Sequence, residues 1–271
     1  RLNAFILVMA GQARRQAEEA DRERASGLDR GPLHGVPISL KDLIDIRGLP
    51  TTAASRVREG HIADRSAPIV IRLREAGAVI VGKTNLHEFA FGTTSEDSAY
   101  GPARNPHDPT RSPGGSSGGS AISVATGMAL ASIGTDTGGS IRIPAAACGI
   151  VGLKPSYGEI STDGVVPLSR TLDHVGPLAL TVDDAWAVHG VLAGATRPLE
   201  TRAPRGLRLG LLRPYFCDLL DRDVRASFDA ALGALRAAGV AIEDVGVAHA
   251  ALTSPVYLHL GFGDGAAIHG P

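Results

Sequence analysis

A turn with two consecutive glycines before a serine is the part of this 271-residue chain best suited to chemistry. The segment is TDTGGSIR, residues 135–142, and its serine is Ser140. Because glycine leaves the backbone bare, several N–H groups can converge in front of the hydroxyl, as an oxyanion hole requires. The other interpretation is a simple Gly-Gly turn closed by a serine. These residues alone leave both interpretations open.

A lysine in an apolar segment is the second candidate for chemistry. Lys41 lies in VPISLKDLIDI, residues 36–46, among aliphatic side chains. Burial there would penalise the ammonium form, so that a neutral Lys41 could act as a general base. The alternative is a lysine that extends its charge to water, and the segment by itself favours that alternative.

Other short motifs suggest different enzymes. Ser117 in GSSGG fits the G-x-S-x-G motif of α/β-hydrolases, but the preceding HDPTRSPG would not form the strand that this motif requires. The nine histidines are scattered and form no metal-binding pair. A Ser-His-Asp set assembled in space stays open, because such triads are defined by geometry and not by order along the chain.

The segment GAVIVGKT, residues 77–84, matches the pattern of a phosphate-binding loop. That loop needs a strand, then a flexible turn, then a helix. Here the sequence predicts a helix over 66–77 with Ser66 as its N-cap, a stop at Gly77 and a strand over 78–81. The order is wrong for nucleotide binding, and Lys83 is interpreted as an ordinary charge at a strand end.

Helical and strand patterns alternate along the chain, which is typical of an α/β protein. A long turn-rich segment, 93–119, separates two of these patterns and has the character of a functional loop. The remaining predicted elements are a helix over 3–24, a strand ending at Lys41, a buried helix over 120–134, a helix over 183–194, a strand over 207–212 and a helix over 224–239.

Composition narrows the choice of partners. Lys plus Arg is 27 and Asp plus Glu is 28, so no strong field attracts nucleic acid or an anionic membrane. No apolar run reaches the ~18 residues of a membrane helix. Two cysteines, Cys148 and Cys217, fit a reducing compartment, and we expect a cytoplasmic protein with a small-molecule partner. Because the chain starts at Arg1 without Met and stops at HGP, we expect that these are not the natural ends.

Four blocks together resemble the amidase signature family of serine hydrolases: GVPISLKDLID, GKTN, SPGGSSGGS and GTDTGGSIRIPAAACGIVGLKPS. The resemblance runs from about Leu33 to about Gly194. It implies an α/β fold with a mixed β-sheet core flanked by helices on both sides. Residues 1–271 would be a single domain of this type, with its C-terminal part missing or shortened.

The resemblance also implies a Ser-cisSer-Lys triad. Ser140 matches the nucleophile, Lys41 the base, and Ser116 the bridging serine, whose preceding peptide bond is cis in the family. We expect no metal and no cofactor. The positions that match the backbone donors of the oxyanion hole are Thr137, Gly138, Gly139 and Ser140.

The family resemblance leaves three functions. The first is hydrolysis of a small-molecule carboxylic amide to an acid and ammonia or an amine, by a stand-alone amidase that could be a homodimer. The second is the glutaminase component of a glutamyl-tRNA or aspartyl-tRNA amidotransferase, its A subunit, which releases ammonia from glutamine for a partner. That component usually has Gln after SIR, where this chain has Ile143, and Met-rich residues near NLHEFAFG, so the sequence favours the first. The third is a non-catalytic scaffold, which retention of the triad disfavours.

Overall fold

The computed structural model describes residues 1–195 and 198–270. The chain folds into two compact units, one formed by residues 1–197 and 261–271 and the other by residues 198–260. All residues of the predicted site belong to the first, larger unit.

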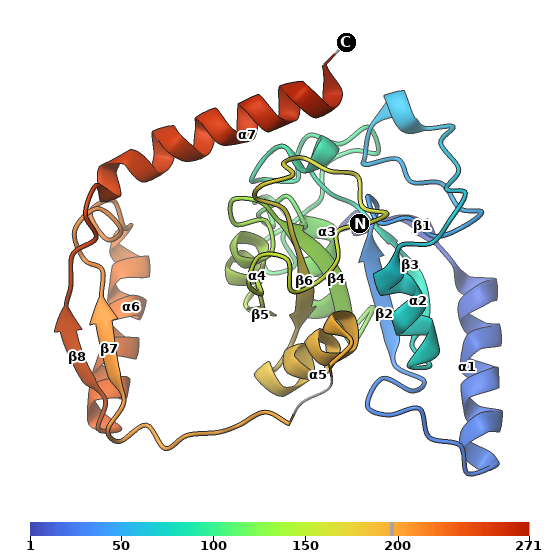
Figure 1. Cartoon of the computed structure of the whole chain (residues 1–271), viewed down its shortest axis with the longest axis horizontal. Coiled ribbons are helices and arrows are strands. Elements are labelled where there is room, and N and C mark those ends of the chain that lie inside the picture. The colour runs from blue at the N-terminus through green and yellow to red at the C-terminus, as the bar shows by residue number, and fades with distance from the viewer. Residues whose placement is uncertain (196–197, 271) are drawn as a thin grey trace. The chain divides into compact units, whose positions relative to one another are not determined.

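A six-stranded mixed sheet is the centre of the larger unit (Figure 1). Strand β2 runs parallel to both of its neighbours, β3 and β4, while the other pairs are antiparallel. In spatial order the strands are β1 (Phe5–Val8), β3 (Val79–Thr84), β2 (Pro37–Lys41), β4 (Ala131–Asp136), β6 (His174–Ala179) and β5 (Val151–Gly152).

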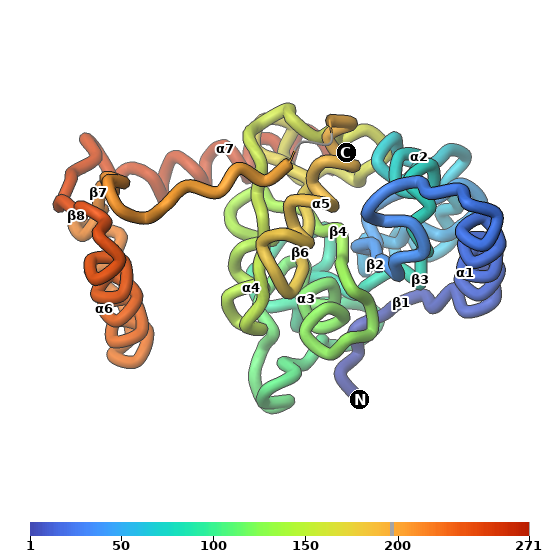
Figure 2. Tube along the Cα trace, turned by 90° about the horizontal axis from the view of Figure 1, so that it is seen from below, coloured from blue at the N-terminus to red at the C-terminus, as the bar shows by residue number. Residues whose placement is uncertain are grey.

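Helices cover both faces of this sheet, which confirms the predicted fold class. Two separate hydrophobic clusters lie on its two sides. One contains apolar residues of α2 (Pro68–Glu75) and α5 (Val182–Ala193), and the other those of α3 (Gly118–Ala125) and α4 (Arg142–Cys148). In Figure 2, α3 and α5 lie on opposite sides of β4 and β6. Helix α1 (Ala10–Ala25) packs beside β3.

The alternation of side chains along β2 directs Lys41 to the face of α3. Ile38 and Leu40 are fully buried in the cluster that contains α2 and α5. Ser39 points the other way, because its hydroxyl lies 2.8 Å from that of Ser123 in α3. Since successive side chains of a strand alternate between faces, Lys41 leaves the sheet on the side of Ser39.

Helix α3 packs unusually close to the sheet, as its small side chains predict. Its residues from Gly118 to Val124 are all buried. At Gly119 a Cβ atom would collide with the backbone oxygens of Ala4 and Asn85, so only glycine allows this approach. The glycine at the second position of α3 is therefore a packing requirement.

Several predicted element boundaries were wrong. The helix predicted over 3–24 begins only at Ala10, because residues 5–8 form β1 and pair antiparallel with β3. The helix predicted over 120–134 ends at Ala125, and β4 starts at Ala131. Small and β-branched apolar residues suit either structure, and pairing with distant strands decided both cases.

The order around GAVIVGKT is helix, glycine, strand, as predicted. Helix α2 ends at Glu75, Gly77 has a φ of 76°, and β3 follows at Val79. Ser66, however, is not the N-cap of α2. Ala67 occupies that position, and the Ser66 hydroxyl accepts a hydrogen bond from the Arg47 N–H at 3.0 Å.

The smaller unit contains a parallel pair of strands, β7 (Arg208–Leu211) and β8 (Ala241–Asp244), with helix α6 (Arg222–Ala237) between them in sequence. Helix α7 (Thr253–His269) contributes its residues from Gly261 onward to the larger unit. Short 3-10 turns are η1 (Arg56–Arg58), η2 (Glu88–Ala90) and η3 (Ala250–Leu252). Among the helices so described, none is both long and apolar enough to cross a membrane. A single domain over 1–271 stays a prediction.

Candidate active site

Lys41 is a fully buried lysine at the end of β2. Its Nζ lies 2.7 Å from Ser116 Oγ and 2.8 Å from Thr135 Oγ1. Burial lowers the pKa of Lys41 to about 7, although the charges of Asp173 and Asp136 act in the opposite direction. A pKa near neutrality leaves a large fraction of Lys41 as the free amine, which is the form that a general base requires.

Ser116 is held at both of its ends. The peptide bond between Gly115 and Ser116 is cis, as the family resemblance implies. The hydroxyl is fully buried against Lys41, while the Ser116 carbonyl accepts hydrogen bonds from the His87 N–H and the Ser95 hydroxyl, each at 3.1 Å. The segment after β3 therefore fixes the backbone of Ser116.

Ser140 lies in the turn between β4 and α4. It is 6% exposed, whereas Lys41 and Ser116 are completely buried. Its carbonyl accepts the Ser117 N–H at 3.2 Å, which joins the two serine turns. Within the described residues its hydroxyl makes no hydrogen bond to protein. The structure thus links Lys41 directly to Ser116, and a backbone hydrogen bond holds the Ser140 turn against the turn that contains Ser116.

The predicted oxyanion donors differ in whether their N–H groups already donate to a protein acceptor. The Gly139 N–H donates to Asp136 Oδ1 at 2.8 Å and is therefore occupied. In the part of the chain that the structure describes, the N–H groups of Thr137, Gly138 and Ser140 donate to no protein acceptor. These three remain candidates for binding an oxyanion.

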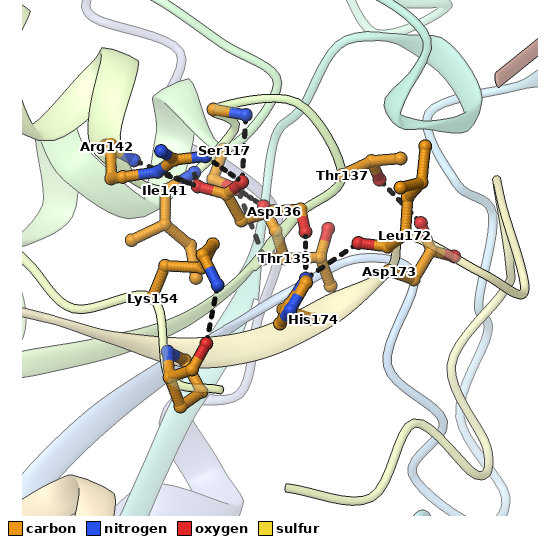
Figure 3. A network of polar contacts seen from close by, with 12 residues as sticks. Ser117, Thr135, Asp136, Thr137, Ile141, Arg142, Lys154, Leu172, Asp173 and His174 are labelled. Atoms are coloured by element: carbon orange, nitrogen blue, oxygen red, sulfur yellow. Dashed lines mark hydrogen bonds and ion pairs between the residues drawn. The ribbon is translucent and has the colours of Figure 1, made fainter. Parts of the chain in front are cut away.

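Asp136, which the sequence analysis did not single out, organises this turn (Figure 3). Its carboxylate accepts the N–H groups of Gly139 and Ile141, and Arg142 binds it through Nε at 3.0 Å and Nη2 at 2.9 Å. Burial raises the pKa of Asp136, but the hydrogen bonds and charge of Arg142 outweigh that effect and the pKa lies below its usual value. Asp136 is thus an anion that ties β4 to the start of α4.

A second carboxylate, Asp173, holds the other side of the turn. Thr137 Oγ1 donates to Asp173 Oδ1 at 2.5 Å (Figure 3). The second oxygen of Asp173 accepts the N–H groups of Leu168 at 2.8 Å and Ser169 at 3.1 Å. No local motif marks Asp173, since it lies 36 positions from Thr137 along the chain.

The residues of the rejected motifs have structural roles. Lys83 is fully buried, and its Nζ lies 2.8 Å from Asp42 Oδ1. The expectation of an ordinary charge was therefore wrong about its burial, although Lys83 does lie near the end of β3. Ser117 occupies the N-cap position of α3 and donates from its buried hydroxyl to the Thr135 carbonyl at 3.2 Å. The sequence did not signal the pairing of Lys83 with Asp42.

A cavity of about 440 Å³ lies in the larger unit beside the segment that holds Ser116. Its walls combine aromatic and polar groups, including His87, Phe89, Phe91 and Asp97. His87 both lines this cavity and binds the Ser116 carbonyl through its backbone N–H. The described residues include no group of three or more His, Cys, Asp or Glu side chains that could hold a metal ion.

The chain belongs to the amidase family. The model of that family, described as Amidase, matches residues 1–269. Among curated proteins it is 49% identical over 263 residues to the A subunit of glutamyl-tRNA(Gln) amidotransferase from Anaeromyxobacter dehalogenans (strain 2CP-C). That match covers 92% of this chain and 54% of the relative, so the chain spans about half the length of the curated relatives it matches.

Two similar solved structures are also amidases. A crystal structure of an amidase has a TM-score of 0.91 and 43% identity, covering 98% of this chain and 61% of that protein. The native peptide amidase from Stenotrophomonas maltophilia has a TM-score of 0.87 and 38% identity, covering 99% of this chain and 59% of that protein. At such identities the likeness extends beyond the fold to the sequence family.

Proposed function

We propose that this chain cleaves a carboxylic amide through an acyl-enzyme on Ser140, with Lys41 as the general base acting through Ser116. The observation that carries the proposal is a fully buried lysine whose Nζ contacts two hydroxyls and whose pKa falls to about 7. Such a lysine can accept a proton at neutral pH, which an ordinary solvated lysine cannot.

The proton path follows the two serines. The free amine of Lys41 takes the proton of Ser116, and Ser116 takes that of Ser140 as the Ser140 oxygen attacks the amide carbon. The C=O bond becomes a C–O⁻ group, and the N–H groups of Thr137, Gly138 and Ser140 are the donors that would stabilise it. The greater exposure of Ser140 suits the residue that must reach the substrate.

Breakdown of this intermediate completes the first half of the reaction. The C–N bond breaks, and the leaving nitrogen receives the proton stored on Lys41, returned through Ser116. Ammonia or an amine departs and the acyl group stays on Ser140 as an ester. A water molecule then attacks the ester with the same base, releasing the acid and restoring the Ser140 hydroxyl.

A second candidate is the glutaminase role within an amidotransferase. The relative at 49% identity is named as the A subunit of such an enzyme, and the comparisons support this role more strongly than the stand-alone amidase that the sequence alone favoured. The chemistry on Ser140 would be the same, with glutamine as the amide and the ammonia delivered to a protein partner. Ile143, which stands where that subunit usually has Gln, is the point against it.

Labelling with a fluorophosphonate tests the shared chemistry. We expect the full-length protein to form a covalent adduct at Ser140 and the Ser140→Ala variant to form none. If the intact protein stays unlabelled, the non-catalytic scaffold replaces this proposal.

Substrate assays separate the two candidates. Hydrolysis of glutamine and of a panel of aliphatic, aryl and peptide-terminal amides should be measured with and without the other subunits of an amidotransferase. Glutaminase activity that depends on those subunits supports the amidotransferase role. Rapid cleavage of other amides without them supports the stand-alone amidase.

A further inference from the structure

We propose that Asp173 is a positioning residue that couples the Ser140 turn to the proton path of Lys41. The proposal rests on the proposed function. In it, the carboxylate of Asp173 has two effects. Asp173 fixes the orientation of the Thr137 peptide, and it supplies the negative charge that stabilises protonated Lys41 when the base has taken its proton.

The first effect follows from hydrogen bonds. Thr137 opens the turn that contains the free N–H donors, and its hydroxyl is bound to Asp173 at 2.5 Å. Asp173 itself is fixed by the backbone N–H groups of Leu168 and Ser169. A carboxylate that accepts three hydrogen bonds has little freedom, so it holds the Thr137 side chain in one position. A displaced donor loses much of its effect on the transition state.

The second effect follows from the charges around Lys41. Asp173 lies immediately before β6, whose first residue, His174, pairs with Asp136 at the end of β4, next to the Thr135 that contacts Lys41. The charges of Asp173 and Asp136 favour the charged form of Lys41, while a protonated His87 opposes it. Asp136 already binds the guanidinium of Arg142 at 2.9 Å. Asp173 binds no cation within the described ranges, 1–195 and 198–270. Of these two carboxylates, Asp173 is therefore the one whose charge no other cation neutralises. It can stabilise Lys41 when Lys41 becomes protonated during catalysis.

Two variants separate these effects. Asp173→Asn removes the charge and changes the bond to Thr137, because the amide oxygen can still accept both backbone N–H groups but the amide nitrogen cannot accept the Thr137 hydroxyl as the carboxylate does. Thr137→Val removes only the hydrogen bond to the turn and leaves the charge of Asp173. Thr137→Ser keeps the hydroxyl and should restore activity.

Asp264→Asn is the matched control. Asp264 binds the hydroxyls of Ser169 and Thr171 in the same loop, but it is not among the charges that act on Lys41. Its substitution should leave both kcat and the pH profile close to those of the wild type.

The rate of fluorophosphonate labelling against pH, together with kcat and KM for the best amide of the panel, measures both effects in the full-length protein. We expect each of Asp173→Asn and Thr137→Val to lower kcat by about tenfold to a hundredfold with little change in KM. Only Asp173→Asn should move the midpoint of the pH profile to lower pH, because loss of the negative charge favours neutral Lys41.

An Asp173→Asn profile with an unmoved midpoint would overturn the electrostatic part, and a Thr137→Val variant within about twofold of wild-type kcat would overturn the positioning part. If Asp173→Asn does not fold, Asp173→Glu retains the charge and should keep the midpoint while lowering kcat; a shifted midpoint then contradicts the inference. Labelling of the wild type, lost in Ser140→Ala, shows that the proposed function stands even when these tests fail.

Discussion

Two fully buried lysines lie on neighbouring strands of the same sheet, Lys41 on β2 and Lys83 on β3. They differ in whether an anion lies beside the amino group. Lys83 faces the carboxylate of Asp42 at 2.8 Å, whereas the contacts of Lys41 are the hydroxyls of Ser116 and Thr135. Burial lowers the pKa of both lysines, but only Lys83 has an anion at contact distance to oppose it.

This comparison shows that burial alone does not make a lysine a base. A carboxylate at contact distance favours the protonated form of a buried lysine. Such a pair contributes to stability, because removing either partner would leave an uncompensated buried charge. An amine that contacts only hydroxyls can lose its proton and gain it back. Asp42, which follows Lys41 directly in the chain, pairs with Lys83 and not with Lys41. The presence or absence of this carboxylate is what distinguishes the two lysines.

Replacing Lys41 should have the largest effect on activity. We expect Lys41→Met to reduce amide cleavage by about 10⁴-fold, since general base catalysis is lost, and to lower the unfolding free energy by only about 1–2 kcal/mol, because two buried hydroxyls lose a hydrogen-bond partner but no ion pair at contact distance is broken. Hydrolysis rates and urea unfolding check both parts. Activity close to that of the wild type would point to a histidine as the base.

Replacing Lys83 should affect stability instead. Lys83→Met leaves Asp42 buried without its cation, and we expect a loss of about 3–5 kcal/mol in the free energy of unfolding. Denaturant unfolding measures this loss, and the double variant Lys83→Met/Asp42→Leu should recover a large part of it. If the single variant is as stable as the wild type, the two lysines do not differ as described.

The pH profile gives the third comparison. Because the base must be neutral, kcat/KM should rise with pH through a midpoint of about 7 and fall about tenfold per unit below it. A midpoint above about pH 9 would mean that Lys41 keeps a pKa close to that of a solvated lysine.

The smallest expected effect concerns the second hydroxyl beside Lys41. Thr135→Val removes a contact of 2.8 Å and should lower kcat/KM by about fivefold to tenfold, equivalent to about 1 kcal/mol for one hydrogen bond. Thr135→Ser is the matched control and should retain activity. Equal loss in both variants would indicate that packing, and not the hydroxyl, matters at this position.

How far the sequence predicted this site depended on the distance between partners. Lys41, Ser116 and Ser140 each lie in a short continuous segment whose sequence resembles the family. The structure brings these three segments into contact. Asp173 carried no such signal, because its meaning depends on a contact across β4 and β6. The burial of Lys83 was missed for the same reason.

The fold followed a similar rule. Helix α2 and the glycine stop after it were predictable from local propensity and periodicity. The strand β1 was not, since its four residues pair with β3 at the opposite end of a long sequence interval. Apolar residues that suit either a helix or a strand take the form that a distant neighbour can bury.

The three adjacent parallel strands β2, β3 and β4 all end at one edge of the sheet, and Lys41, Lys83 and Asp136 lie at those ends. This arrangement gives the site a rigid frame. The hydrogen-bonded strands fix the positions of Lys41 and Asp136, and the segments that directly follow β3 and β4 hold the backbone of Ser116 and supply the Ser140 turn. Substitutions in these segments would therefore act on the geometry of the site as directly as substitutions in the strands.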